Sequence, residues 1–315
     1  MYRPGTLEKK SEIPTVSLFD YWMGVLLAVA CGVVNNVGMV LQKKVVNDLP
    51  TKAREERFKR SLARNPLWLV GLVLQMVIGS ILFVLAQVYI GPALIPGLMA
   101  AGLIVLAIGS VRIVGERIGV PEAIGIGLMI FGIVLLGLSG LDIATESYNA
   151  LDIAFLTRVA LFTLTLLFIA VGCALGQRRS VAYRGTLLAI VSGCMFALSN
   201  FWIFPLMATI VHVLGFTFIV VELALFVLAA VILVLTNVFG ISTIQDSFKV
   251  GEASLMVPIQ QIPIQVAPAF VYLAVFLLAP PAGVYSLMLL GFGIGFIIIS
   301  SFLLAKRQAQ IQAIK

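Results

Sequence analysis

Seven polar side chains lie inside long apolar stretches, and their chemistry suits the binding of a solute. They are amides and one carboxylate: Asn35, Asn36, Gln42, Asn200, Glu222, Gln261 and Gln265. A polar group in hydrocarbon is costly and normally faces the interior of a helix bundle or an aqueous cavity. We therefore predict that these residues bind substrate. For each amide the alternative is an interhelical hydrogen bond, worth about 0.6 kcal/mol, that only holds helices together.

Helical spacing places several of these amides on shared faces. Asn35 and Gln42 are seven residues apart, and Gln261 and Gln265 are four apart, so each pair lies on one side of its helix. Pro258 precedes the second pair by three residues. Because proline has no N–H, it leaves a carbonyl of the preceding turn free to coordinate a cation or a donor. Helix breaks are predicted at Pro258 and at Pro96.

The two adjacent asparagines are expected at the centre of the bundle. Asn35 and Asn36 are about 100° apart around a helix, so one can line a cavity while the other bonds to a neighbouring helix. We predict that at least one of them faces a central cavity. Asn200, Gln261 and Gln265 are expected to share that cavity.

Glu222, in FIVVELALF (218–226), is the one carboxylate predicted deep within an apolar stretch. Cation binding or proton coupling is one interpretation, and a structural bond to a neighbouring helix is the other. A hard cation such as Mg²⁺ prefers several oxygen ligands, so one carboxylate with amides is a sparse site. The single histidine, His212, is predicted at a membrane interface. Neither an enzyme nor a cofactor is expected, because no nucleophile–base or metal constellation is evident.

The composition identifies the solvent around these residues. Of 315 residues, 61% are hydrophobic and 11% are charged, whereas ordinary globular chains have roughly 45–50% and about 25%. A soluble fold could not bury this much apolar surface, so we predict an integral membrane protein. The net charge of +7 comes mainly from basic residues between apolar stretches. That pattern indicates membrane topology and anionic lipid rather than nucleic acid.

Nine apolar stretches are each long enough to cross a bilayer, which takes about 20 residues. They are predicted as helices at 20–42, 66–90, 92–112, 118–140, 151–176, 185–211, 214–239, 252–278 and 282–305. The predicted fold class is an all-α polytopic membrane protein. Gly125, Gly132, Gly291 and Gly295 predict close helix packing, the last two as a GxxxG pair.

Positive charge alternates between successive connections. Basic residues occur in loop 43–65, near 112–117, in 177–184, in 240–251 and in the 306–315 tail, and the connections between these have none. Lysine and arginine mark the cytoplasmic side of short loops. The 1–19 tail is therefore predicted outside the cell and the C-terminus in the cytoplasm. Lys43 and Lys44 are interpreted as interfacial anchors that end the first helix, and loop 43–65 is expected to contact anionic headgroups.

Two pairs of similar stretches indicate an internal repeat. GVLLAVACG (24–32) resembles GTLLAIVSG (185–193), and GPALIPG (91–97) resembles GEASLMVP (251–258), with Pro96 opposite Pro258. The two offsets, 161 and 162 residues, correspond to five helices. Because five is odd, the second copy must be inverted, and inverted repeats are typical of secondary transporters. We predict a 4+1+4 architecture, with repeats at 20–140 and 184–305 and a linking helix at 151–176.

The stretch GPALIPGLMAAGLIVLAIGSVRIVGERIG (91–119), followed by PEAIGIGLMIFGIVLLGLSG (121–140), resembles the drug/metabolite transporter superfamily. The nine-helix layout, VLQKK (40–44) and GEASLMVPIQQ (251–261) are most similar to its NIPA-like magnesium transporter branch. The resemblance implies alternating access with Mg²⁺ as the solute. The second helix lacks the glutamate typical of that branch, and the first has no carboxylate past Asp20. The latter argues against proton-coupled drug export.

From these observations we expect a secondary transporter in the cell membrane. Its transported partner is expected to be Mg²⁺ or, as the alternative, a small polar metabolite. A non-transporting scaffold or receptor is the other class left open, and a homodimer is one assembly left open.

Overall fold

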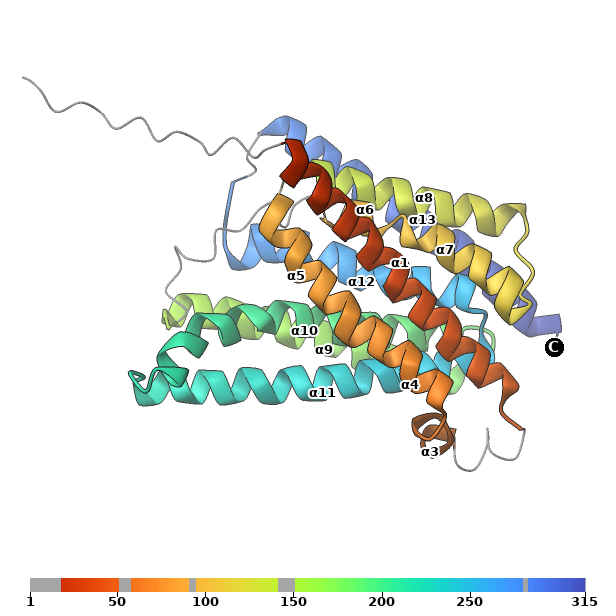
Figure 1. The fold of residues 1–315 in the computed structure, drawn as a ribbon, viewed down its shortest axis with the longest axis horizontal. Coiled ribbons are helices and arrows are strands. Elements are labelled where there is room, and N and C mark those ends of the chain that lie inside the picture. The colour runs from red at the N-terminus through yellow and green to blue at the C-terminus, as the bar shows by residue number, and fades with distance from the viewer. Residues whose placement is uncertain (1–17, 51–57, 91–94, 141–150, 280–282, 315) are drawn as a thin grey trace, which may run out of the picture.

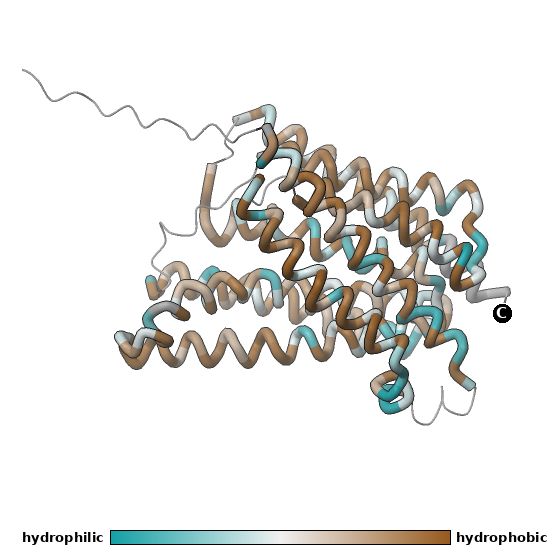
Figure 2. The backbone as a smooth tube through the Cα atoms, viewed as in Figure 1, coloured by the Kyte–Doolittle hydropathy of each residue, from teal (hydrophilic) through white to brown (hydrophobic). Residues whose placement is uncertain are grey.

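A computed structural model describes residues 18–50, 58–90, 95–140, 151–279 and 283–314. The described residues are almost entirely helical and include no strand. Figure 1 shows long helices packed side by side, with the start of α1 and the end of the last helix at opposite ends of the bundle. Hydrophobic residues occupy the middle parts of the helices, and hydrophilic residues gather toward the end where the chain finishes (Figure 2).

Within the described residues, eight helical segments are long and apolar enough to cross a membrane. In chain order they are α1 (Leu18–Asp48), the continuous segment α4–η1–α5 (Pro66–Val73, Leu74–Ile78, Gly79–Ile90), α8 (Val120–Leu138), α9 (Ile153–Arg179), α10 (Arg184–Leu214), α11 (Val220–Val250), α12 (Ala253–Phe270) with η4 (Val271–Val275), and α13 (Val284–Ile314). A short helix, α3 (Phe58–Ala63), precedes α4. The prediction of an all-α polytopic membrane protein is confirmed at this level.

Local sequence explains where the second membrane segment begins. The Asn65 side chain accepts hydrogen bonds from the backbone N–H groups of Leu67 at 2.9 Å and Trp68 at 3.2 Å. Pro66 occupies the first helical position, where its missing N–H has no cost. These signals lie in the ARNP turn, and the segment covers the predicted range 66–90.

The third predicted helix, 92–112, is not continuous. It consists of α6 (Ile95–Met99), α7 (Gly102–Gly109) and η2 (Ser110–Val114), with a turn at Ala100 and Ala101. The break lies where α1 approaches most closely: a Cβ added at Gly32 would lie 2.2 Å from the Met99 oxygen, and one at Gly102 would lie 2.1 Å from the Gly32 oxygen. Glycine is required at this crossing because only a missing side chain allows such backbone contact.

The two prolines predicted to break helices, Pro96 and Pro258, both lie within helical segments. Pro96 lies within α6, four residues before the turn at Ala100. Pro258 lies inside α12, and α12 remains helical through Pro258, Pro263 and Pro268. The sequence prediction of a break at Pro258 is therefore wrong, because the packed surroundings of α12 keep the helix continuous without that N–H.

Helices α8 and α13 pack against each other along their length. A Cβ added at Gly132 would lie 2.8 Å from the Gly293 oxygen, and the Ser300 hydroxyl donates to the Gly125 oxygen at 2.6 Å. A Cβ at Gly291 or Gly295 would meet nothing within 4 Å. The predicted GxxxG contact at those two positions is wrong, since the helix turns Gly293 toward α8 instead.

The remaining helices form two groups, α1 to α7 and α9 to α12, whose apolar cores join at one end only. The largest cluster combines Val40 and Leu106 of the first group with Ile244, Phe248 and Met256 of the second. At the other end the clusters are separate. One is formed by Ala28, Ala86 and Ile95 of the first group, and another is formed by residues of α9, α10, α11, α12 and η4 together with Phe276, which directly follows η4.

Candidate functional site

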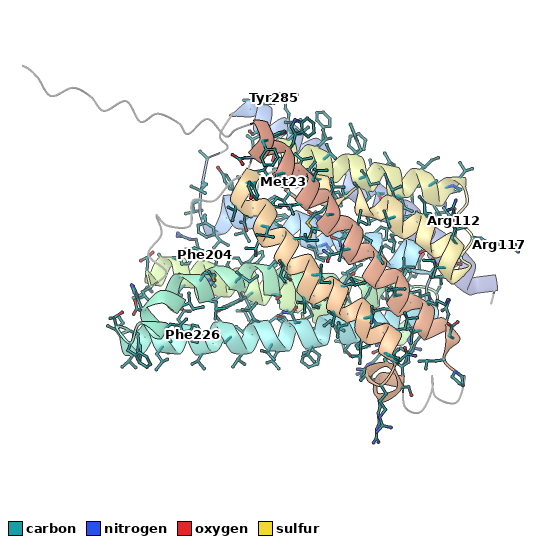
Figure 3. All side chains as sticks on the ribbon, in the orientation of Figure 1. Met23, Arg112, Arg117, Phe204, Phe226 and Tyr285 are labelled. Atoms are coloured by element: carbon teal, nitrogen blue, oxygen red, sulfur yellow. The ribbon has the colours of Figure 1, made fainter. Side chains whose placement is uncertain are left out.

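The connection between α11 and α12, residues 250–253, is the centre of the candidate site, and we call it the junction. It lies at the end of the bundle where the two groups share a core. Figure 3 places Arg112 and Arg117 at this end and Met23 and Tyr285 at the opposite end. Side chains from α1 and from the turn after η2 reach the junction.

Lys43 reaches the junction from α1. Its ammonium donates hydrogen bonds to the backbone oxygens of Phe248 and Gly251, both at 2.6 Å, and the side chain is only 4% exposed. The last carbonyls of a helix lack intrahelical partners and carry the negative end of its dipole. Lys43 therefore satisfies the C-terminal end of α11. The interpretation of Lys43 as an interfacial anchor that ends α1 is wrong, because α1 continues to Asp48.

Glu116 reaches the other side of the junction. Its carboxylate accepts hydrogen bonds from the backbone N–H groups of Ala253 at 2.7 Å and Ser254 at 3.0 Å. These are the first N–H groups of α12, where a helix favours a negative charge. Lys43 and Glu116 thus place opposite charges on the two helix ends that meet at the junction, and each charge is opposite in sign to the dipole charge of the helix end that it contacts.

Gln42 forms a third link at this end. Its amide donates to Gln75 of η1 at 2.9 Å and accepts a hydrogen bond from Gln245 of α11. Gln42 is 1% exposed, so this predicted substrate residue joins three helices in the present conformation. The short helix α3 adds an ion pair of 3.7 Å between Lys59 and Asp246.

The two asparagines face the first group. The Asn35 Oδ1 atom lies against Gly79, and the Asn36 amide donates to the Gly32 oxygen at 2.8 Å while lying against Gly102. Both Oδ1 atoms are buried and accept no hydrogen bond from the described residues. Among the described residues, no hydrogen bond joins Asn35 or Asn36 to the amides of α10 or α12. The structure therefore does not bring the predicted substrate-binding residues together.

The amides of α10 and α12 differ in their exposure to solvent. Asn200 is exposed, and Gln261 and Gln265 are half-buried, with a hydrogen bond of 3.3 Å from Gln265 to Gln261. Gln260 instead points into the core and donates to the Ser192 hydroxyl at 2.8 Å. Gln261 and Gln265 therefore share the predicted polar face of α12, and both residues are half-buried.

Glu222 is not deep within a helix. The helix predicted at 214–239 begins at Val220, so Glu222 lies in its first turn. The carboxylate accepts a hydrogen bond from the Ile219 N–H at 3.1 Å and lies 2.9 Å from the Nδ1 atom of His212. The prediction of a deep carboxylate is wrong, because the apolar residues before Val220 form the connection and not the helix.

Sequence reasoning missed Lys43 and Glu116 as a pair. One signal was present for Lys43, which is seven residues after Asn36 and so lies on the same inward face of α1. For Glu116 the signal was an acidic residue within the basic turn RIVGER. Among the described residues, no group of three or more His, Cys, Asp or Glu side chains could hold a metal ion.

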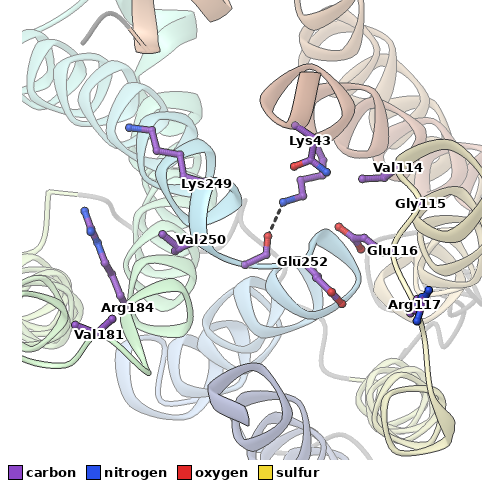
Figure 4. Close-up of a pocket in the computed structure, with 12 residues that line it drawn as sticks. Lys43, Val114, Gly115, Glu116, Arg117, Val181, Arg184, Lys249, Val250 and Glu252 are labelled. Carbon is purple, nitrogen blue, oxygen red and sulfur yellow. Dashed lines mark hydrogen bonds between the residues drawn. The ribbon is translucent and has the colours of Figure 1, made fainter. Parts of the chain in front are cut away.

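A cavity of about 690 Å³ adjoins these contacts, and we call it the junction cavity. Four connections that the charge alternation assigned to one side contribute to it: residues 43–47, 114–117, 181–184 and 249–252. Figure 4 shows Lys43 reaching the junction with Glu116 nearby. The structure thus gathers these connections at one end of the bundle.

The described part of the chain contains eight long apolar helices, which define a polytopic α-helical membrane protein. Their exposed residues include Val88, Leu161, Phe168 and Phe302. Such exposed apolar faces are suited to lipid. No family model, no curated protein and no solved structure matches the chain.

Proposed function

We propose that this chain is a secondary transporter of the drug/metabolite type and works by alternating access. One observation carries the proposal: the two helix groups share a core and polar bonds at the junction end, whereas their apolar clusters are separate at the other end. A carrier needs two arrangements of similar packed units that open to opposite sides. We assign the present arrangement to the form that is closed at the junction.

The contacts at the junction suit a reversible closure. The bonds of Lys43 and Glu116 go to backbone groups at helix ends, and water could replace these partners after the groups separate. Helices α8 and α13 also support the proposal, because the close contacts of their glycines pack the two helices tightly against each other. We propose that this pair stays fixed while the two groups move.

We further propose that the solute is a small polar metabolite. Asn200, Gln261 and Gln265 offer amide donors and acceptors that remain accessible. The carboxylate expected for Mg²⁺ lies instead in the first turn of α11 with His212. A hard divalent cation would be poorly served by amides alone, so the Mg²⁺ proposal of the NIPA-like resemblance is the less favoured of the two.

A flux assay with purified protein in liposomes tests the proposal. Each polar metabolite of a panel, and Mg²⁺, is added separately outside the liposomes. Uptake is measured with and without the same solute inside the liposomes. We expect uptake of one metabolite that internal solute accelerates, since exchange is the signature of a carrier. The variant Gln261→Leu should reduce this flux, whereas Thr165→Leu, on an exposed face of α9, should not. Absence of exchange for every solute would refute carrier function, and exchange of Mg²⁺ alone would replace the metabolite proposal.

A further inference from the structure

Glu116 connects the two helix groups through its side chain. It lies in the turn after η2, and its carboxylate oxygens accept hydrogen bonds from the first N–H groups of α12, at 2.7 Å from Ala253 and 3.0 Å from Ser254. Its own N–H donates to the Ser110 oxygen at 2.9 Å, which ties this turn to η2, the continuation of α7. Glu116 is therefore held by the first group while its charge acts on the second.

The surroundings of this carboxylate combine burial with access from one side. Glu116 is 8% exposed and lines the junction cavity (Figure 4). Ser110 and Ser254, whose backbones bond to Glu116, are fully buried, and their hydroxyl oxygens have no hydrogen-bond partner among the described residues. A neutral carboxyl group has a hydrogen that needs an acceptor, and hydroxyl oxygens can accept it. The carboxylate is thus reached through the cavity, and the residues around it have unused hydrogen-bonding capacity.

We propose that Glu116 is a proton-binding site and that a proton on its carboxylate opens the junction. The ionised carboxylate makes two charge-assisted bonds and faces the positive end of the α12 dipole. When a hydronium ion that enters the cavity gives its proton to one oxygen, water is left, the carboxyl group becomes neutral, and the protonated oxygen becomes a donor facing an N–H donor. The proton and α12 therefore compete for the same two oxygens.

This competition couples proton binding to movement of the helices. Because the closed arrangement uses the ionised carboxylate, protons shift the population toward the open arrangement, as any ligand does that prefers one conformation. In a carrier, the same linkage lets a proton gradient drive the solute. That consequence rests on the proposed alternating access, whereas the proton site itself does not.

Other charged groups adjoin Glu116 and must be separated from it. Those that line the junction cavity come from α1, the Glu116 turn, α10, α11 and the junction: Lys43, Arg117, Arg184, Lys249 and Glu252. Lysine and arginine stay charged in acid, so Glu252 is the other group of this lining that acid can neutralise. Outside the cavity, acid can also protonate side chains of the neighbouring helices: Asp20 and Asp48 of α1, Glu122 of α8, His212 of α10, and Glu222 and Asp246 of α11.

The first experiment measures the width of the junction against pH in the full chain, purified in a neutral detergent. Spin labels are attached to Asn47→Cys of α1 and Val181→Cys before α10, two exposed positions on different groups, after the native cysteines are replaced by alanine. Pulsed electron paramagnetic resonance then gives the distance between them. Between about pH 7.5 and about pH 4.5, we expect the ratio of open to closed protein to rise at least about tenfold, which corresponds to about 1.4 kcal/mol.

Two variants test the competition from its two sides. Glu116→Gln is a permanent mimic of the neutral carboxyl group, so it should give the longer distance at both pH values. Ala253→Pro deletes one N–H donor and leaves the carboxylate in place. Proline is tolerated at the first helical position, and Glu252 already has the extended backbone that suits a residue before proline. With one competitor removed, opening should occur at higher pH than in the parent.

Three variants serve as matched controls, because each removes one acid-sensitive charge and leaves Glu116 in place: Glu252→Gln, Glu122→Gln and Asp246→Asn. Each should keep the acid response of the parent. The proposal is overturned if the parent distance does not change with pH, if Glu116→Gln still responds to acid, or if a control variant abolishes the response. Should Glu116→Gln fail to fold, the Ala253→Pro shift decides, and an unchanged opening pH would overturn the proposal.

A second experiment tests the coupling in liposomes, with whichever solute the parent protein exchanges. A proton gradient imposed across the membrane should drive accumulation of that solute. Exchange without any effect of the gradient would overturn the coupling. Absence of exchange for every solute would refute carrier function alone, since the distance measurement still decides whether Glu116 binds the proton.

Discussion

Replacing Lys43 with methionine tests whether its contacts hold the junction closed. The change Lys43→Met keeps an apolar stem of similar length and removes the ammonium that bonds to the oxygens of Phe248 and Gly251. The two carbonyls then lose a buried donor at the C-terminal end of α11. Because the side chain is 4% exposed, solvent cannot replace the ammonium while the groups remain packed.

The size of the effect follows from the two bonds and one desolvated charge. Hydrogen bonds to a charged group contribute about 1.5–3 kcal/mol each. Burying an ammonium costs several kcal/mol, and methionine removes this cost as well as the bonds. We expect a net loss of about 2 kcal/mol from the closed arrangement, which corresponds to roughly a 30-fold larger open population.

A buried cysteine at the junction reports on opening. Ala253 is fully buried, so Ala253→Cys should react slowly with a maleimide in detergent. The native Cys31 and Cys173 are replaced by alanine, and Cys194, buried in the core of the second group, is kept as an internal reference. Lys43→Met should raise the labelling rate at position 253 about 30-fold, because labelling follows the open population. The rate at Cys194 should stay low.

The neighbouring lysine provides the control. Lys44→Met removes the same charge from α1, but Lys44 is half-buried and makes no contact with the junction like that of Lys43. We expect it to leave labelling at position 253 unchanged. The reasoning would be refuted if Lys43→Met folded normally and labelled at the parent rate, or if Lys44→Met accelerated labelling equally.

Three further predictions concern the helix crossing, the acidic residue of α11 and the topology. Gly102→Ala should lower the free energy of unfolding by about 3 kcal/mol, because its Cβ would lie 2.1 Å from a backbone oxygen of α1. Gly127→Ala is the control and should not destabilise the protein, because its Cβ would meet nothing within 4 Å. Chemical denaturation of the two variants measures the difference. Glu222→Gln should retain solute flux in liposomes. Its thermal stability should fall slightly, because Glu222 caps α11 and contacts His212. Loss of flux in well-folded protein would restore the cation-binding role predicted for Glu222. A cysteine at Glu146 should label from outside intact cells and one at Arg57 only after permeabilisation, although both positions lie outside the described residues; the reverse order would invert the topology.

The sequence by itself determined the existence and most positions of the membrane helices. Apolar length is a local property, and local signals such as Asn65 and Pro66 mark where a helix begins. It failed at α11, where a loop was predicted over 240–251 and the helix continues to Val250. Polar residues there suggested a connection. They are instead held in a helix by contacts with α1 and α3, such as those of Gln245 and Asp246.

The candidate site was decided by tertiary structure alone. Lys43 bonds to Phe248, 205 residues away, and Glu116 bonds to Ala253, 137 residues away. A charged residue beside an apolar run is equally suited to an interfacial anchor and to a helix cap, since both roles need only charge and reach. Which role it takes depends on which helix end the packing brings near it. Periodicity along one helix contains no information about that distant partner, because the free energy of the contact arises only after the two helix groups meet.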